Sequence, residues 1–164
     1  MQTHWRHFLQ ATLDRRPNVG RLVDLCEQNY ALLQRLMPEL LHMRGEYQAL
    51  SCGHADLHLD VLEHSRYTSL IHLTYYFEHA QGRQPEPDAV LRVYHDARQL
   101  EAIELRQADA VLSADALYEE PGLHNKWQLN CFVGKWLEFC VRAGYRFAPS
   151  EPLLVEGVAL DFSD

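Results

Sequence analysis

Apolar side chains recur along this chain at two different spacings. Between Asn125 and Gly144 they return every three or four residues, which places them on one face of a helix and turns Lys135, Glu138 and Arg142 away from it. That face consists of Leu129, Phe132, Val133, Trp136, Leu137, Cys140 and Val141. Aromatic side chains bury a large apolar area, so we expect a broad apolar partner, namely an antiparallel sheet built from the middle of the chain.

The helical spacing also occurs twice near the N-terminus. From Trp5 onward the pattern predicts a short helix that ends before Pro17. A second apolar stripe starts at Val19 and stops before Pro38, because a proline disfavours helical geometry in the residue before it. We therefore expect two N-terminal helices within about residues 4–37.

After Gly45 the apolar period shortens to two residues, which is typical of β-strands. The prolines and the glycine between Ala80 and Asp88 favour a loop there. Strands that follow one another through short turns pair antiparallel, because parallel pairing requires a long crossover. The alternation predicts strands over residues 46–52, 56–63, 66–78, 89–95 and 99–105.

Beyond these strands, the segment 107–122 suits either a short helix or an irregular crossover. Asn125 is a good N-cap for the C-terminal helix, with Gln128 three residues later as in a capping box. Gly144 is a good C-terminal stop for that helix.

These elements predict an α+β fold. An antiparallel sheet of about five strands carries two N-terminal helices and one C-terminal helix on one face, which satisfies both the alternating strands and the one-sided helices. A length of 164 residues suits one domain. We expect residues 1–164 to form it, with helices at about 4–37, a sheet at about 46–105, a helix at about 125–143 and a tail at 149–164.

Charge and composition narrow the classes of function. The net charge of −8 argues against nucleic-acid binding, which needs a basic surface. No apolar run reaches the roughly 20 residues of a membrane span, and the N-terminus lacks the apolar core of a signal peptide. We therefore expect a cytoplasmic protein with reduced cysteines and no membrane attachment. Neither a GxGxxG fingerprint nor a phosphate-binding loop occurs, and we predict no cofactor.

Four segments carry a family resemblance, namely LCEQNYALLQRLMP (Leu25 to Pro38), SRYTSL (Ser65 to Leu70), RVYHDA (Arg92 to Ala97) and NCFVGKWLEFC (Asn130 to Cys140). In this order they resemble the YqiB-like family of small bacterial proteins, whose members carry a domain of unknown function. The resemblance covers about Leu22 to Ala148 and implies a single cytoplasmic bacterial domain. It implies no activity, substrate or catalytic residue.

A candidate metal site lies near the predicted second strand. His54, Asp56, His58 and Asp60 alternate, with His64 just beyond, and such side chains are suitable ligands for zinc or iron. Residues two apart on a strand lie about 6–7 Å apart, so two of them can share an ion but four cannot converge on it. A solvated outer sheet face explains the same pattern, and we predict no metal site.

A second candidate site follows from the predicted strand pairing. Arg66 and Tyr67 start one strand while His95 and Asp96 end its antiparallel neighbour, which brings both pairs to the same end of the sheet. The four side chains can bind an anion, with His95 oriented by a carboxylate for proton transfer. The alternative is turn chemistry, in which Asp96 caps the turn, His95 packs at the sheet end and Arg66 pairs with Glu63.

Two hypotheses of function remain. The first is a non-catalytic binding or protein-interaction domain that holds an unknown protein or small molecule, in a groove between sheet and helices. The second is a small enzyme or anion-binding protein that uses Arg66, Tyr67, His95 and Asp96. The apolar tail after Pro149 can dock on its own sheet, cover the N-terminal helix or add to an edge strand of a second copy, so we also consider a homo-oligomer.

Overall fold

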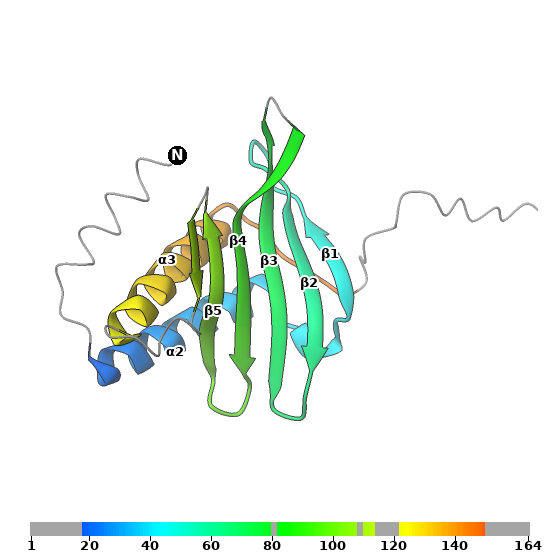
Figure 1. Cartoon of the computed structure of the whole chain (residues 1–164). Coiled ribbons are helices and arrows are strands. Elements are labelled where there is room, and N and C mark those ends of the chain that lie inside the picture. The colour runs from blue at the N-terminus through cyan, green and yellow to red at the C-terminus, as the bar shows by residue number, and fades with distance from the viewer. Residues whose placement is uncertain (1–17, 80–81, 108–109, 114–121, 150–164) are drawn as a thin grey trace, which may run out of the picture.

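The computed structural model of the chain combines helices with one sheet (Figure 1). It describes residues 18–79, 82–107, 110–113 and 122–149. The helical elements are α2 (Val19–Leu36), the short 3-10 helix η1 (Leu40–His42) and α3 (Gly122–Arg142). The strands are β1 (Gly45–Ala49), β2 (Leu57–His64), β3 (Thr68–His79), β4 (Gly82–Tyr94), β5 (Gln99–Gln107) and β6 (Ala110–Ser113).

The strands form one antiparallel sheet in the order β1-β2-β3-β4-β5-β6, so each strand pairs with its neighbours in the chain. The predicted α+β class and the antiparallel sheet are confirmed. Within the described residues the sheet has six strands where about five were expected. The extra strand, β6, lies in the segment for which a helix or an irregular crossover was predicted. Its four residues pair with the end of β5, a contact that the short apolar run did not reveal.

The predicted loop from Ala80 to Asp88 is wrong, because β4 already begins at Gly82 and pairs with the end of β3. Proline lacks the N–H that a sheet ladder needs, so prolines argued against a strand here. The pairing register shifts between Thr74 and Tyr76, which leaves Pro87 in an irregular part of β4. A bulge of this kind accommodates proline, and β4 therefore continues through the segment.

The helices differ from the predicted set of three. The helix expected after Trp5 lies outside the described residues, which contain one N-terminal α-helix, α2. That helix begins as predicted, since the Asn18 side chain accepts a hydrogen bond of 2.8 Å from the Arg21 N–H, and it ends at Leu36.

The predicted start of the C-terminal helix at Asn125 is also wrong. α3 begins at Gly122, so Asn125 lies inside its first turn instead of capping it. Gln128 does not complete a capping box with Asn125, because its side chain hydrogen-bonds the His124 ring, one turn earlier, at 2.9 Å.

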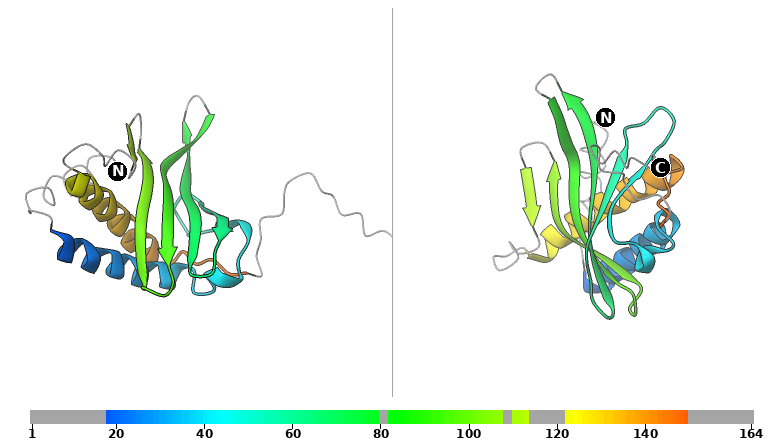
Figure 2. Two further views of the ribbon diagram at one scale, coloured as in Figure 1. Left: turned by 60° about the horizontal axis from the view of Figure 1, so that its bottom comes forward. Right: turned by 90° about the vertical axis from the view of Figure 1, so that its right-hand side faces the viewer.

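The helices α2 and α3 lie against each other behind one face of the sheet (Figures 1 and 2). Their backbones approach the sheet most closely at β5, toward one side and not across its middle. The Ala102 N–H donates to Asn130 Oδ1 at 2.9 Å, and Asn29 Nδ2 donates to the Asn130 carbonyl at 2.9 Å, which ties β5, α3 and α2 together. The core between these layers includes Leu33, Leu36, Phe132, Trp136, Leu137, Leu59, Ile71, Leu73, Leu91 and Leu100.

Candidate functional site

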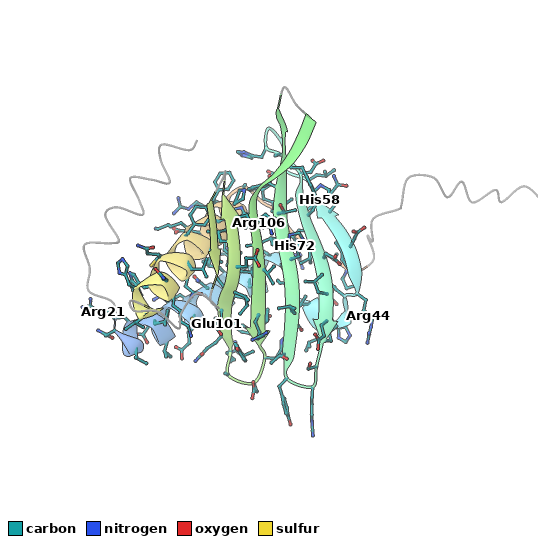
Figure 3. The ribbon with its side chains drawn as sticks, viewed as in Figure 1. Arg21, Arg44, His58, His72, Glu101 and Arg106 are labelled. Carbon is teal, nitrogen blue, oxygen red and sulfur yellow. The ribbon has the colours of Figure 1, made fainter. Side chains whose placement is uncertain are left out.

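The opposite face of the sheet is not covered by α2 or α3, and we call it the uncovered face (Figure 3). Strand alternation sends every second side chain to this face while its neighbours enter the core. Apart from the buried Thr74, these outward side chains are half-buried or exposed, and most are polar. They include Glu46, Gln48, His58, Asp60, His72, Asp88, Val90, Arg92, Glu101, Glu104 and Arg106.

One part of the uncovered face is hollowed where β1, β2 and β3 meet. This acidic hollow has a volume of about 290 Å³ and is lined by Glu46, His58, Leu59, Asp60, His72, Thr74 and Tyr76. Glu46 and Asp60 are direct partners in the strand register. Like charges in this position repel each other and destabilise the strand pair. The His58 ring meets the Tyr76 ring edge-on, with 4.6 Å between their centroids.

His72 is one of two histidines that line the acidic hollow. Its Nε2–H donates to the Asp88 carboxylate on the neighbouring strand. This hydrogen bond is the main cause that raises the pKa of His72 above its usual value, and Asp60 and Glu104 add to the effect while burial opposes it. The charged form of His72 is thus stabilised by carboxylates of the same face.

A second hollow lies farther along β3, and we call it the arginine hollow. Its volume is about 370 Å³ and its lining consists of Glu63, Ser65, Thr68, Ser69, Leu70, Arg92 and Tyr94. The Tyr94 hydroxyl donates to Glu101 at 3.0 Å, and burial raises the pKa of Tyr94. Hydroxyl groups and one exposed guanidinium make this hollow a hydrogen-bonding surface.

The four residues predicted to meet at the sheet end do so only in part. The His95 N–H donates to the Tyr67 carbonyl at 2.8 Å, which places the β2–β3 and β4–β5 turns side by side. Arg66 lies over the Tyr67 ring, with its Cζ 5.1 Å from the ring centroid, and both side chains are exposed. Asp96 is exposed as well. None of the four lines the acidic or the arginine hollow.

The ring of His95 instead joins a chain of hydrogen bonds that sequence reasoning missed. His64 Nε2 contacts the Met43 carbonyl at 2.7 Å, and a carbonyl only accepts, so this nitrogen carries the proton. In neutral His64, Nδ1 then accepts from the Ser69 hydroxyl at 2.6 Å. Ser69 Oγ in turn accepts from His95 Nε2–H at 2.6 Å. The single carbonyl thereby sets the direction of every proton in the chain.

Burial explains the electrostatics of this His64–Ser69–His95 chain. Ser69 is 1% exposed, and burial, followed by the neighbouring His64, lowers the pKa of His95. One signal in the sequence pointed to this cluster, because Ser69 is a polar residue on the inward, apolar side of an alternating strand.

The alternating histidines and aspartates near β2 do not share one face. β2 begins at Leu57, so His54 and Asp56 precede it. His54 packs edge-on against Phe139 with 5.3 Å between ring centroids, and Asp56 accepts a hydrogen bond of 2.6 Å from Gln48. Among the residues with described positions, no three His, Cys, Asp or Glu side chains gather closely enough to hold a metal ion.

The cysteines are free thiols. Burial raises the pKa of Cys26 to about 11 and that of Cys131 and Cys140 to about 12, so these three are protonated near neutral pH. Cys52 is exposed. None of the helices within the described ranges has both the length and the apolar character that crossing a membrane requires.

Residues 32–146 match a family model described as a protein of unknown function, DUF1249. The chain belongs to the DUF1249 family. The chain is also 30% identical over 138 residues to the uncharacterized protein YqiB of Escherichia coli, in strains K12 and O157:H7 alike. That alignment covers 81% of this chain and 95% of each relative, which confirms the YqiB-like resemblance. No solved structure matches the chain. The DUF1249 match includes both hollows and the whole His64–Ser69–His95 chain.

Proposed function

We propose that the protein is a non-catalytic binding domain that holds its partner on the uncovered face of the sheet. The observation that carries this proposal is the pair of hollows on a face that α2 and α3 leave open. Between the sheet and the helices, Leu33, Phe132 and Trp136 are at most 1% exposed, which favours the opposite face over a groove between the layers. Binding on the opposite face leaves this core intact.

A wet outer face alone is ordinary for an antiparallel sheet. Two features distinguish the uncovered face from an ordinary solvated sheet face. The hollows give it concave shape, and Glu46 faces Asp60 directly in the register. A like-charge pair opposes folding, and a bound partner that supplies positive charge would relieve the repulsion.

The experiment compares two double variants as bait in affinity capture from the native cell. Leu70→Arg with Val90→Arg places two bulky cations on the uncovered face, where both native side chains are half-buried. Val19→Arg with Val23→Arg makes the same change on α2, where the native side chains are 67% and 37% exposed. We expect the first variant to lose partners that the wild type and the second variant retain. Equal capture by all three proteins would contradict the proposal.

A second candidate function is anion binding or small-molecule catalysis at the sheet end, with Arg66, Tyr67, His95 and Asp96. The observation in its favour is the hydrogen bond from His95 to Tyr67, which holds the two turns together. The test is a titration with inorganic phosphate in which the NMR signals of the histidine rings are monitored. This function predicts a saturable shift of the His95 signals that Arg66→Gln abolishes; an unchanged spectrum would rule it out.

A further inference from the structure

We propose that the occupant of the uncovered face is an extended peptide segment of another protein, which places an arginine or lysine side chain in the acidic hollow. This inference rests on the proposed function and names the chemistry of the partner. Three observations support it: the unbalanced charge of the acidic hollow, its size, and the position of the arginine hollow along the same strand.

Several charged side chains of the uncovered face have a partner of opposite charge. Arg106 Nε lies 3.2 Å from Glu104, and Lys126 Nζ lies 3.6 Å from Glu101. His72 pairs with Asp88. Within the described part of the chain, by contrast, neither Glu46 nor Asp60 has a cationic side chain within ion-pair distance, although they face each other on β1 and β2.

His72 lines the same hollow but is already paired with Asp88, and a further counter-charge for Glu46 and Asp60 can come from a bound partner. No lysine or arginine lines the acidic hollow. Two carboxylates side by side match a guanidinium, which can donate to both at once, or an ammonium group as a point charge. The Tyr76 ring on the same lining adds an aromatic surface against which the stem of a long cationic side chain can pack. A cationic side chain thus satisfies both the charge and the surface of this hollow.

The size of the acidic hollow is compatible with a single side chain. Pockets for drug-sized ligands and cofactors typically measure about 300–1,000 Å³. At about 290 Å³ the acidic hollow lies at the lower limit of this range and accommodates one long side chain.

The second hollow indicates that this side chain belongs to a peptide. In the strand register Asp60 is level with His72, and Arg92 is level with Leu70, so the two groups lie two residues apart along β3. Two residues of an extended strand span about 7 Å, which equals the distance between side chains i and i+2 on one face of an extended peptide. A peptide lying along β3 can therefore reach both hollows, with its cation beside Glu46 and Asp60 and a hydrogen-bonding side chain beside Arg92.

The test uses the full chain and labelled eight-residue peptides that carry one arginine and one glutamine two positions apart in a serine background. Fluorescence anisotropy measures their affinity. The matched peptide carries citrulline, which keeps the shape of arginine without its charge. We expect citrulline to weaken binding by about tenfold or more, because charge-assisted hydrogen bonds are lost. Equal binding of the two peptides would overturn the inference.

Variants locate the binding in the hollow. Glu46→Gln with Asp60→Asn should reduce the affinity for the arginine peptide by about tenfold. The melting temperature of this double variant should stay equal or rise, because the repulsion between the two carboxylates is removed. Asp24→Asn with Glu27→Gln changes the net charge equally on the exposed surface of α2 and should leave the affinity nearly unchanged. Equal losses in both variants would show unspecific charge attraction and contradict the inference.

Two further outcomes separate this inference from the proposed function. Free arginine or spermidine that binds as tightly as the peptide would show a small-cation site and refute the extended peptide. If the arginine peptide fails while Leu70→Arg with Val90→Arg still loses captured partners, only the chemistry of the occupant is wrong. If those partners are retained as well, the proposed function fails together with the inference.

Discussion

Ser69 shows how much a single residue depends on its surroundings. Its position in the alternation of β3 directs the hydroxyl into the core, where water cannot satisfy it. His64 from β2 and His95 after β4 supply the two missing partners. A buried hydroxyl between two imidazoles thus connects β2, β3 and the turn after β4, and its loss removes the hydrogen bonds of His64 Nδ1 and His95 Nε2.

Ser69→Ala tests this connection. We expect the free energy of unfolding to fall by about 1–3 kcal/mol, because two half-buried ring nitrogens lose their hydrogen bonds. Urea denaturation measures the change. Ser65→Ala is the matched control, since its hydroxyl is exposed and donates to Glu63 at 3.3 Å, and it should change stability by less than about 0.5 kcal/mol. Equal effects of the two substitutions would contradict the role of Ser69.

His95 and His72 should give opposite dependences of stability on pH. The pKa of His95 is lowered, first by burial and then by His64, so the folded state resists its protonation. Its contribution to stability is lost as the pH falls through the unfolded value of 6.5 toward the lowered one. The pKa of His72 is raised, mainly by Asp88, so its contribution is present below 6.5 and lost as the pH rises through the raised value.

Urea unfolding from about pH 5 to pH 8 separates the two histidines. We expect His95→Gln to reduce the loss of stability on the acidic side, and His72→Gln to reduce the loss on the alkaline side. If both substitutions altered the same side, the assignment of the two shifts would be wrong.

At the scale of elements, the contact between α2 and α3 depends on a close approach at Gly134. A Cβ atom built there lies 2.5 Å from Asn29 Oδ1, nearer than real contacts allow. The Asn29 side chain cannot move away freely, because its Nδ2 donates to the Asn130 carbonyl at 2.9 Å. Glycine at this position therefore lets the two helices meet while the buried amide keeps its hydrogen bond.

Gly134→Ala should lower the free energy of unfolding by about 1–3 kcal/mol through overpacking, in spite of the higher helix propensity of alanine. Gly20→Ala is the control, because its Cβ lies 3.4 Å from Asn18 Oδ1, an ordinary contact, and we expect no loss of stability there. Combining Gly134→Ala with Asn29→Ala removes the clash. The double variant should lose less stability than the sum of the losses in the two single variants.

At the scale of the whole molecule, the two faces of the sheet have different tasks. α3 closes one face with Phe132, Trp136 and Leu137, each at most 1% exposed. The other face carries the two hollows and most of the charged side chains of the strands. Because the apolar core is complete on one side, substitutions on the uncovered face can alter binding without unfolding the protein.

Phe132→Ala should destabilise the protein by about 3–5 kcal/mol, since a fully buried ring leaves a cavity. Phe139→Ala on the same helix is the matched control, because the Phe139 ring packs only at the margin of the core. This variant should lose clearly less stability. Thermal and urea unfolding measure both changes. Comparable losses would contradict α3 as the closing layer of the core.

The sequence by itself determined the local features of this protein. The spacing of apolar residues identified α2, α3, five of the strands and the inward side of β3, because periodicity reports which side of an element is buried. The short turns also dictated antiparallel pairing. This topology predicted that Tyr67 and His95 lie at the same end of the sheet, and the two turns that carry them do meet.

Only the tertiary structure decided how far strands extend and which side chains meet across them. β4 runs through its prolines and β6 pairs with β5 because of hydrogen bonds to neighbouring strands, which no local pattern records. The facing pair Glu46 and Asp60 depends on the register between β1 and β2. A shift of one residue would separate them, and register is set by long-range packing of the whole sheet.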